Sequence, residues 1–346
     1  MQNFSRLTET VQQNCYITDA RHAHDLTMCT YLLEMRQYYR WERGIPFSQA
    51  IPKDDLGSWL SERERLWDGL ESDAYQPLPV EGALRDPFDA EAVNRELLPH
   101  GYVYGGGFGR FRKPHFFLGQ LLRSEEREGF TVLVAGREHA RDLIAPPAAL
   151  QGRTVFLRRE AVQRVVWDKI EGWQWRKRDN SLGRAIACYP FADDLDAALE
   201  SMTDNESEAM ILHEVGEGLA GEVLGGAWND MLATLSSPKA EIVARAVRDH
   251  LADCLYTLPA LLEREAYCSL HFYFGNFDGM RQHIFPDALR SYQRWVETGN
   301  LKTLLATVRS GKERWLETAQ LVLEGYQNDR EDCGKALERL LAASEG

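Results

Sequence analysis

NESEAMILHEVGEGLAGEVLG, residues 205–225, is the stretch on which the predicted fold depends. Apolar residues recur in it at spacings of three or four, which at about 100° per residue predicts a helix with one buried face. The residues of that face are Ala209, Leu212, Val215, Leu219 and Val223. Glu206, His213 and Glu217 fall within about 40° of one another beside this face. A histidine and two carboxylates are therefore expected at the edge of a helical core.

Glycines are dense at the end of the same stretch. Gly216, Gly218 and Gly221 each weaken a helix by about 1 kcal/mol relative to alanine. Their density predicts either a kink or the close approach of a neighbouring element.

Length and composition indicate a globular protein. The chain has 346 residues, of which 44% are hydrophobic, so it can bury a sizeable core. No apolar run reaches the roughly 18 residues of a membrane span, and the first residues lack the pattern of a secretory signal. The sequence therefore predicts a cytoplasmic protein. Its six cysteines form no CxxC pair, which favours buried free thiols over a zinc ribbon or a redox dithiol.

Charge is unevenly distributed along this acidic chain. The net charge of −13 disfavours nucleic acid as a partner. Between Pro99 and Arg184, however, Lys and Arg outnumber Asp and Glu by seven. This basic middle segment either docks on acidic parts of its own chain or holds an anionic ligand or partner.

The predicted fold class is mainly α, with a C-terminal helical bundle, a smaller α+β middle segment and an N-terminal helical region. The expected divisions are 1–90, 91–180 and 181–346, with the bundle carrying the candidate site. A long helix is expected at Asp19–Trp41. The expected strands are Tyr102–Tyr104, Arg110–Leu118, Phe130–Ala135 and Thr154–Arg158, with Ala161–Trp167 as a further candidate.

A glycine-rich segment, YGGGFGR at Tyr104–Arg110, has two interpretations. A phosphate-binding loop would need the pattern GxxxxGK[ST] followed by a helix, whereas this segment is followed by an expected strand. A flexible hairpin turn is the favoured interpretation.

Three further histidines have acidic or aromatic neighbours. His22 and Asp25 are three residues apart, and so are His250 and Asp253. Each pair fits two metal ligands or an aspartate-oriented base, but also an ordinary hydrogen-bonded pair. His271 lies among aromatic residues that would exclude water and keep its imidazole neutral.

Metal binding would use these side chains because neutral imidazole nitrogen and carboxylate oxygen are both metal donors. The predicted ligands are His213, Glu217, Glu206, His250 and Asp253. Abundant carboxylates favour iron, ahead of manganese or zinc. Facing helices that each contribute a His and a carboxylate would form such a site inside a bundle.

Two short resemblances bear on this site. HEVGE at His213–Glu217 resembles the HExxH motif of the zincins, which implies a ligand role for His213 and a general-base role for Glu214. Glu217 stands where that family has its second histidine, which disfavours proteolysis. The spacing of Glu206 and His213 is similar to a ligand spacing in haem-oxygenase-like di-metal oxidases, which are also helical bundles. His250 and Asp253 do not reproduce the later His and Asp run of that family.

The leading hypothesis is a metal-dependent oxidoreductase with an iron or di-metal centre, acting on a small, anionic substrate. The catalytic residues would be Glu214, His271 and Tyr267. Arg110, Arg112 and Lys113 would help to hold the substrate. Two alternatives remain open, namely a non-enzymatic binding or scaffold protein and a mononuclear metal hydrolase. A protein partner or a second copy of the chain also remains open, whereas a membrane is not expected.

Overall fold

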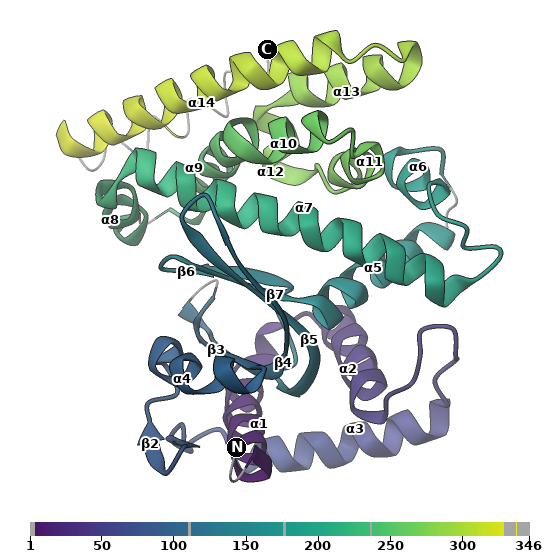
Figure 1. Cartoon of the computed structure of the whole chain (residues 1–346), viewed down its shortest axis with the longest axis vertical. Helices are drawn as coiled ribbons and strands as arrows, with labels where there is room; N and C mark the ends of the chain where they lie inside the picture. Colours follow the sequence, from purple (N-terminus) through teal and green to yellow (C-terminus); the bar gives the residue numbers. More distant parts are fainter. Residues whose placement is uncertain (1–3, 110–111, 176–177, 236, 329–336, 338–346) are drawn as a thin grey trace. The chain divides into compact units, whose positions relative to one another are not determined.

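The structure is a computed structural model that describes residues 4–109, 112–175, 178–235, 237–328 and Leu337 (Figure 1). Helices form 65% of the chain and strands 15%, which confirms a mainly α protein with a smaller α+β segment. The chain forms two compact units, of residues 1–168 with 190–207 and of residues 169–189 with 208–346. The division into 1–90, 91–180 and 181–346 stays a prediction.

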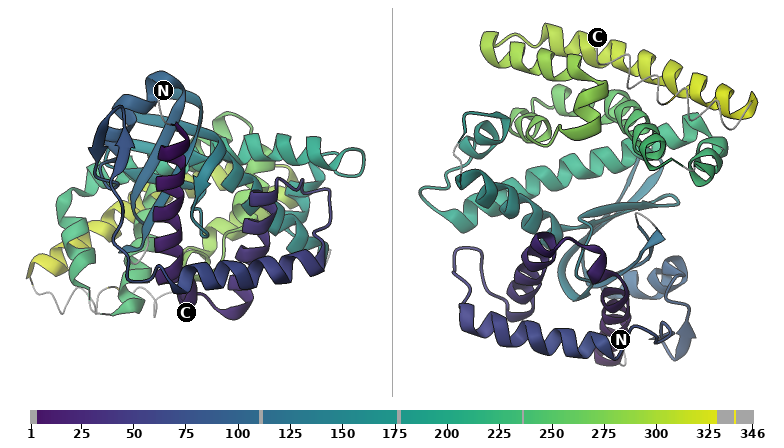
Figure 2. Two further views of the ribbon diagram at one scale, coloured as in Figure 1. Left: turned by 90° about the horizontal axis from the view of Figure 1, so that it is seen from below. Right: turned by 180° about the vertical axis from the view of Figure 1, so that it is seen from behind.

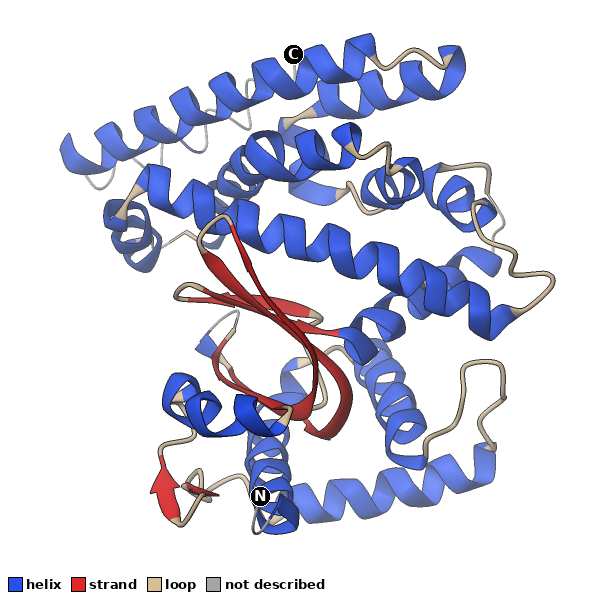
Figure 3. Cartoon of the chain, viewed as in Figure 1, coloured by secondary structure: helices blue, strands red, loops and turns tan. Residues whose placement is uncertain are grey.

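The first unit contains the strands (Figure 3). Its helices are α1 (Phe4–His22), α2 (Met28–Arg43), α3 (Lys53–Asp68), α4 (Ala90–Leu97), the first part of α5 (Arg159–Gln174) and the first part of α7 (Leu195–Leu224). A small hairpin consists of β1 (Leu78–Val80) and β2 (Ala83–Arg85). The main sheet consists of β3 (Tyr102–Phe108), β4 (Pro114–Arg127), β5 (Phe130–Arg141), β6 (Ala148–Gln151) and β7 (Thr154–Arg158).

The main sheet has the order β3-β4-β5-β7-β6. The strands β5 and β7 are parallel, and the other neighbours are antiparallel. The pairing of β4 with β5 shifts register three times between Leu118 and Arg123. Bulges of this kind bend a strand and increase its twist, and the sheet curls accordingly (Figure 1).

Helix α1 packs against the curled sheet (Figure 2). Leu7, Val11 and Cys15 recur every four residues and are almost completely buried, in one cluster with Phe116 and Leu118 of β4. The thiol of Cys15 donates a hydrogen bond of 3.3 Å to the Phe116 carbonyl oxygen. This helix therefore forms the core of the first unit together with β4 and β5.

Two predicted elements of this unit were wrong. The long helix at Asp19–Trp41 is two helices, because α1 ends at His22 and the Thr27 side chain caps the start of α2. Ala161–Trp167 is part of helix α5 rather than a strand, and its valines at positions 162 and 166 are buried one turn apart.

The glycine-rich segment is strand rather than turn as far as Phe108. A Cβ atom at Gly105 would lie 2.1 Å from the ring of Phe117, and one at Gly106 would lie 2.2 Å from the Pro87 carbonyl oxygen. These glycines allow β3 to approach its neighbours closely.

The second unit is helical throughout its described residues. Its helices are the end of α5, α6 (Ser181–Ala187), the second part of α7 (Leu195–Leu224), α8 (Gly226–Thr234), α9 (Pro238–Ala252), α10 (Leu258–Glu263), α11 (Tyr267–Gly275), α12 (Gly279–Ile284), α13 (Pro286–Thr298) and α14 (Lys302–Asn328). The predicted helix at 205–224 is therefore the continuation of a longer one. Leu212 and Val215 are fully buried as predicted, whereas Val223 is 54% exposed.

The cysteines differ from the expectation of free thiols in one place. Cys188 and Cys268 form a disulfide bond between the end of α6 and α11. Cys15 and Cys254 are buried free thiols, and Cys29 is exposed. Among the described residues, no helix is long and apolar enough to cross a membrane.

Candidate functional site

Asp253 is the centre of a polar network in the second unit. It begins a π-helical turn, Asp253–Thr257, and its side chain is completely buried. His213 Nδ1 lies 2.9 Å from one carboxylate oxygen. The Tyr273 hydroxyl donates a hydrogen bond of 2.8 Å to the other oxygen, which also pairs with the guanidinium of Arg281. The carboxylate therefore meets three partners, two of which are basic.

Close packing of α7 against α9 brings His213 to Asp253. A Cβ atom at Gly216 would lie 2.9 Å from the Ala252 carbonyl oxygen. Gly221, one turn later, has no such neighbour within 4 Å. The glycine density of α7 thus reflects close approach at Gly216, one turn after His213.

The imidazole of His213 lies between two carboxylates. Its Nε2 atom is 3.4 Å from the Glu217 carboxylate, on the side opposite Asp253. Burial opposes the charged form, but Asp253 and then Glu217 outweigh it and raise the pKa of His213 well above its usual value. Burial would also raise the pKa of Glu217, yet His213 and Arg248 lower it to about 2. The network therefore contains an imidazolium between two ionised carboxylates.

A doubly protonated ring has no lone pair with which to bind a metal. Metal binding at His213 would require loss of the proton that now faces Glu217. No group of three or more His, Cys, Asp or Glu side chains within the described ranges is arranged to hold a metal ion.

Two of the other predicted ligands, Glu217 and Asp253, contact His213, whereas His250 and Glu206 have different surroundings. His250 is neutral, because burial and then the Arg281 charge lower its pKa to about 3. Its Nε2 atom lies 2.9 Å from the Arg281 carbonyl oxygen, and its ring stacks on Trp315. Glu206 is buried on the part of α7 that belongs to the first unit.

Two of the predicted catalytic residues, His271 and Tyr267, both contact Trp295, whereas Glu214 lies on another helix. Glu214 is half-buried on α7, and its negative charge contributes to the raised pKa of Arg248. His271 Nδ1 lies 2.9 Å from the Tyr292 hydroxyl, and its ring stacks on Trp295. Burial lowers the pKa of His271, in line with the expected neutral imidazole. Tyr267 is 36% exposed beside Trp295.

The basic residues proposed to hold a substrate are only partly described. Arg110 lies outside the described residues. Lys113 pairs with Asp25 at 2.7 Å, and Asp25 in turn lies 3.4 Å from His22. The carboxylate of the predicted His22–Asp25 pair is therefore bound to a lysine. Arg112 has a positive φ of 56° in the turn before β4.

Sequence reasoning missed the cations of the Asp253 network. Arg281 of α12 pairs with Asp253, and Arg248 of α9 pairs with Glu217 at 2.8 Å. Their partners are remote in sequence, so helical spacing gave no signal.

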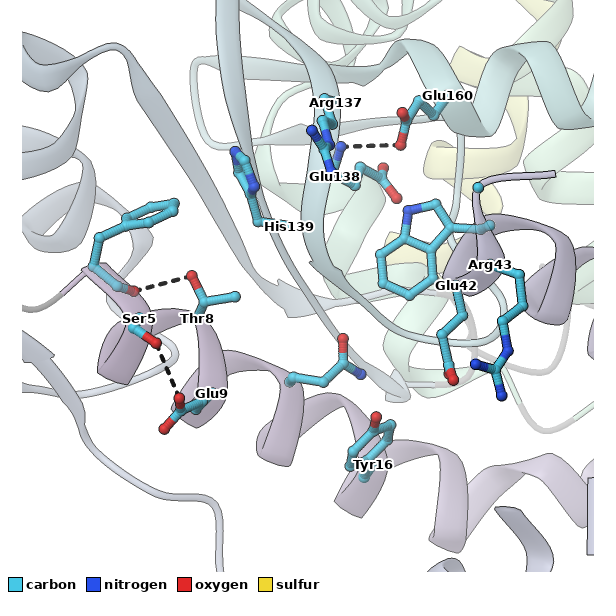
Figure 4. Close-up of a pocket in the computed structure, with 14 residues that line it drawn as sticks. Ser5, Thr8, Glu9, Tyr16, Glu42, Arg43, Arg137, Glu138, His139 and Glu160 are labelled. Atoms are coloured by element: carbon cyan, nitrogen blue, oxygen red, sulfur yellow. Dashed lines mark hydrogen bonds between the residues drawn. The ribbon is translucent and has the colours of Figure 1, made fainter. Parts of the chain in front are cut away.

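A cleft in the first unit was also missed (Figure 4). Its volume is about 870 Å³. One face of α1 lines it with Phe4, Ser5, Thr8, Glu9, Gln12 and Tyr16. The end of α2 contributes Trp41, Glu42, Arg43 and Gly44, strand β5 contributes Arg137, Glu138 and His139, and α5 contributes Glu160. Figure 4 shows the α1 side chains facing those of β5.

Glu138 and Glu160 line the cleft and differ in their partners. Glu138 is paired with an arginine, whereas Glu160 accepts a hydrogen bond from a backbone N–H. Glu138 is completely buried, and Arg158 binds both of its carboxylate oxygens, at 2.6 and 3.0 Å. The backbone N–H of Glu138 donates a hydrogen bond of 2.9 Å to Glu160. Burial, together with the Glu138 charge, raises the pKa of Glu160. Glu138 is thus held by Arg158, while burial makes Glu160 hold a proton more readily than a free glutamate does.

Arg158 extends this pair into a buried network. Its guanidinium also lies 3.1 Å from Asp142, and Asp142 lies 2.6 Å from His115 Nδ1. Burial opposes ionisation of Asp142, but His115 and Arg158 together lower the pKa of this carboxyl group. Glu138, at the wall of the cleft, is therefore connected through Arg158 to Asp142 in the core.

Family comparison covers nearly the whole chain. Residues 6–158 match the N-terminal domain, and residues 163–344 the C-terminal domain, of a family of unknown function, DUF6866. The chain belongs to the DUF6866 family. No curated protein and no solved structure matches it. In this DUF6866 chain, the cleft residues from Thr8 to His139 belong to the N-terminal domain, whereas Phe4 and Ser5 precede the match. The Asp253 network belongs to the C-terminal domain. Glu160 lies in the short segment between the two matches.

Proposed function

We propose that the protein binds a small molecule that carries both a cationic and an anionic group, in the cleft between α1, the end of α2 and β5. The observation that carries this proposal is the lining of the cleft, where charges of both signs alternate with aromatic rings. Its volume of about 870 Å³ falls within the range of small-molecule sites.

Two kinds of charged group are available to such a ligand. Glu9 and Glu160 supply carboxylate oxygens. Glu9 accepts a hydrogen bond of 3.0 Å from the Ser5 hydroxyl, and Glu160 accepts one of 2.9 Å from the Glu138 N–H. Because a carboxylate has about four acceptor positions, both retain capacity for a ligand ammonium group. Arg137 is exposed on β5 and offers a guanidinium to a ligand carboxylate. Amino acids and short peptides have this combination of charges.

The aromatic residues of the cleft supply apolar contact. Phe4 stacks on Tyr102 with ring centroids 4.2 Å apart. Trp41 packs against Tyr38. Rings held in this way bury ligand surface at little cost in side-chain entropy.

Binding can be tested with matched ligands in the full chain. Amino acids and dipeptides are first screened by thermal shift, each against its N-acetyl and its carboxamide derivative. We expect unmodified compounds to bind and each derivative to bind roughly tenfold or more weakly, because one charge-assisted contact is lost. Titration calorimetry then measures the affinities.

Variants assign each charge to a residue. Glu160→Gln should weaken the unmodified compound but not its N-acetyl form, and Arg137→Gln should weaken it but not its carboxamide. Arg95→Gln is the matched control, because Arg95 is exposed on α4 outside the cleft. The proposal fails if no compound binds, or if Arg95→Gln weakens binding as much as Arg137→Gln.

A second candidate function is metal-dependent oxidation at His213, with iron favoured over manganese or zinc. It is supported by the contact of Asp253 with Nδ1 of His213, which directs Nε2 towards the Glu217 carboxylate. An aspartate behind a histidine is the usual arrangement around protein-bound metals. His213 and Glu217 would be the ligands, in competition with the proton and with Arg248.

Elemental analysis of protein purified without an affinity tag tests this candidate. It predicts near-stoichiometric iron, manganese or zinc, which falls in His213→Ala but not in His24→Ala, where an exposed histidine is removed. Folded protein without metal, including after incubation with Fe²⁺, would exclude it.

A further inference from the structure

A groove between α13 and α14 has the lining of an anion site. Its volume is about 440 Å³. One face of α13 contributes Asp287, Arg290, Ser291 and Arg294, at successive spacings of three, one and three residues. Helix α14 contributes Thr303, Thr307, Ser310, Gly311 and Arg314, and Phe285 closes one end. Three guanidinium groups and four hydroxyl groups therefore face a groove with a single carboxylate.

The charge of this groove contrasts with that of the chain. The protein has a net charge of −13, so a cluster of three arginines around one aspartate is a local reversal of sign. Asp287 pairs with Arg290 at 2.5 Å and lies 3.7 Å from Arg314. These side chains are half or more exposed, and such pairs contribute little to stability. A bound anion can therefore compete for both arginines.

The remaining donors are positioned for such an anion. Among the described residues, the Arg294 guanidinium makes no hydrogen bond or ion pair. Arg314 is held by its packing over Trp315, 4.8 Å from the ring centroid, and by a hydrogen bond to the Ile284 carbonyl oxygen. Ser291 and Thr307 lie 2.6 Å apart and bridge the two helices across the groove.

We propose that this groove binds a phosphorylated small molecule through its phosphate group. Planar guanidinium groups bind phosphate oxygens in pairs, and hydroxyl groups can donate to the third oxygen. A phosphate group with two negative charges balances three arginines better than a ligand carboxylate with one charge does. The volume accommodates a group of the size of a pentose beside the phosphate. This site is independent of the cleft in the first unit.

Titration of the full chain with ribose 5-phosphate, inorganic phosphate and ribose, at constant ionic strength, tests the site. We expect both phosphates to bind and ribose not to bind. Arg294→Gln and Arg290→Gln should each weaken ribose 5-phosphate by roughly tenfold or more, because a charge-assisted contact is lost. Arg309→Gln is the control, since it removes the same charge from α14 at an exposed position outside the lining.

Three results would overturn the proposal. The first is the absence of binding by either phosphate to folded protein. The second is an equal loss in Arg309→Gln, which would indicate general attraction of anions to α14. The third is tighter binding of a single-stranded RNA oligomer than of ribose 5-phosphate, which would assign the arginines to a nucleic-acid backbone. Circular dichroism of each variant ensures that a loss is not caused by unfolding.

Discussion

Asp253→Asn is expected to lower the free energy of unfolding of the second unit by about 3–5 kcal/mol. Asparagine keeps the shape of the side chain but removes its charge. Arg281 and the His213 imidazolium would then share a buried site without the carboxylate that now binds both. The cost is large because Asp253 is completely buried and no solvent can replace the lost interaction.

Hydrogen exchange measured by mass spectrometry separates this effect from the rest of the chain. Peptides from α9 and α12 should exchange faster in Asp253→Asn, while peptides from β4 and β5 should not change. Asp287→Asn is the control, because Asp287 forms exposed ion pairs worth less than about 1 kcal/mol. A loss in Asp253→Asn as small as that of the control would show that the network is not buried and paired as described.

The pH dependence of stability provides a second readout of the same network. The folded pKa of His213 is raised, so its stabilisation is complete below its unfolded pKa of about 6.5 and is lost as pH rises through the folded value. The folded pKa of Glu217 is lowered to about 2, so its stabilisation is complete above about 4.5 and is lost towards pH 2. In Asp253→Asn, the loss on the alkaline side should shift to lower pH, because Asp253 is the strongest group holding the proton on His213.

Arg158→Gln should cost the first unit a comparable amount, about 3–5 kcal/mol. Arg158 is the cation shared by Glu138 and Asp142, and all three side chains are buried. Without it, two carboxylates would remain in the core with too few partners. The pKa of Asp142 should rise, and Asp142 would retain His115 as its main basic contact.

Arg159→Gln is the matched control, one residue along the chain. Arg159 pairs with Glu200 and Asp204, which are 50% and 65% exposed, so its loss should cost less than about 1 kcal/mol. Urea unfolding followed by exchange of β5 and β7 peptides measures both variants. Equal stability of Arg158→Gln and Arg159→Gln would contradict the described network.

Much of the fold could be predicted because it follows from local periodicity. The buried positions of α7 recur every three or four residues, and that helix was found. Helix α5 was misread because Val162, Val165 and Val166 are β-branched residues that also favour strands. In the structure, Val162 and Val166 are both buried, one helical turn apart, as expected for a helix.

The sites depend more on contacts between distant segments. His213 and Glu217 could be paired from helical spacing, and Asp253 was predicted as a metal ligand, which stays a prediction. The contacts of Asp253 with Tyr273 of α11 and Arg281 of α12 could not be predicted from helical spacing. The cleft combines α1, α2, β5 and α5, so no single stretch of sequence carried its pattern.

A crystal structure of the full chain with the tightest-binding amino acid or dipeptide tests the proposed function most directly. We expect ligand density in the cleft between α1 and β5, with the ligand ammonium near Glu160 and its carboxylate near Arg137. Density at another place in the chain, or a cleft that stays empty at saturating ligand, would contradict it.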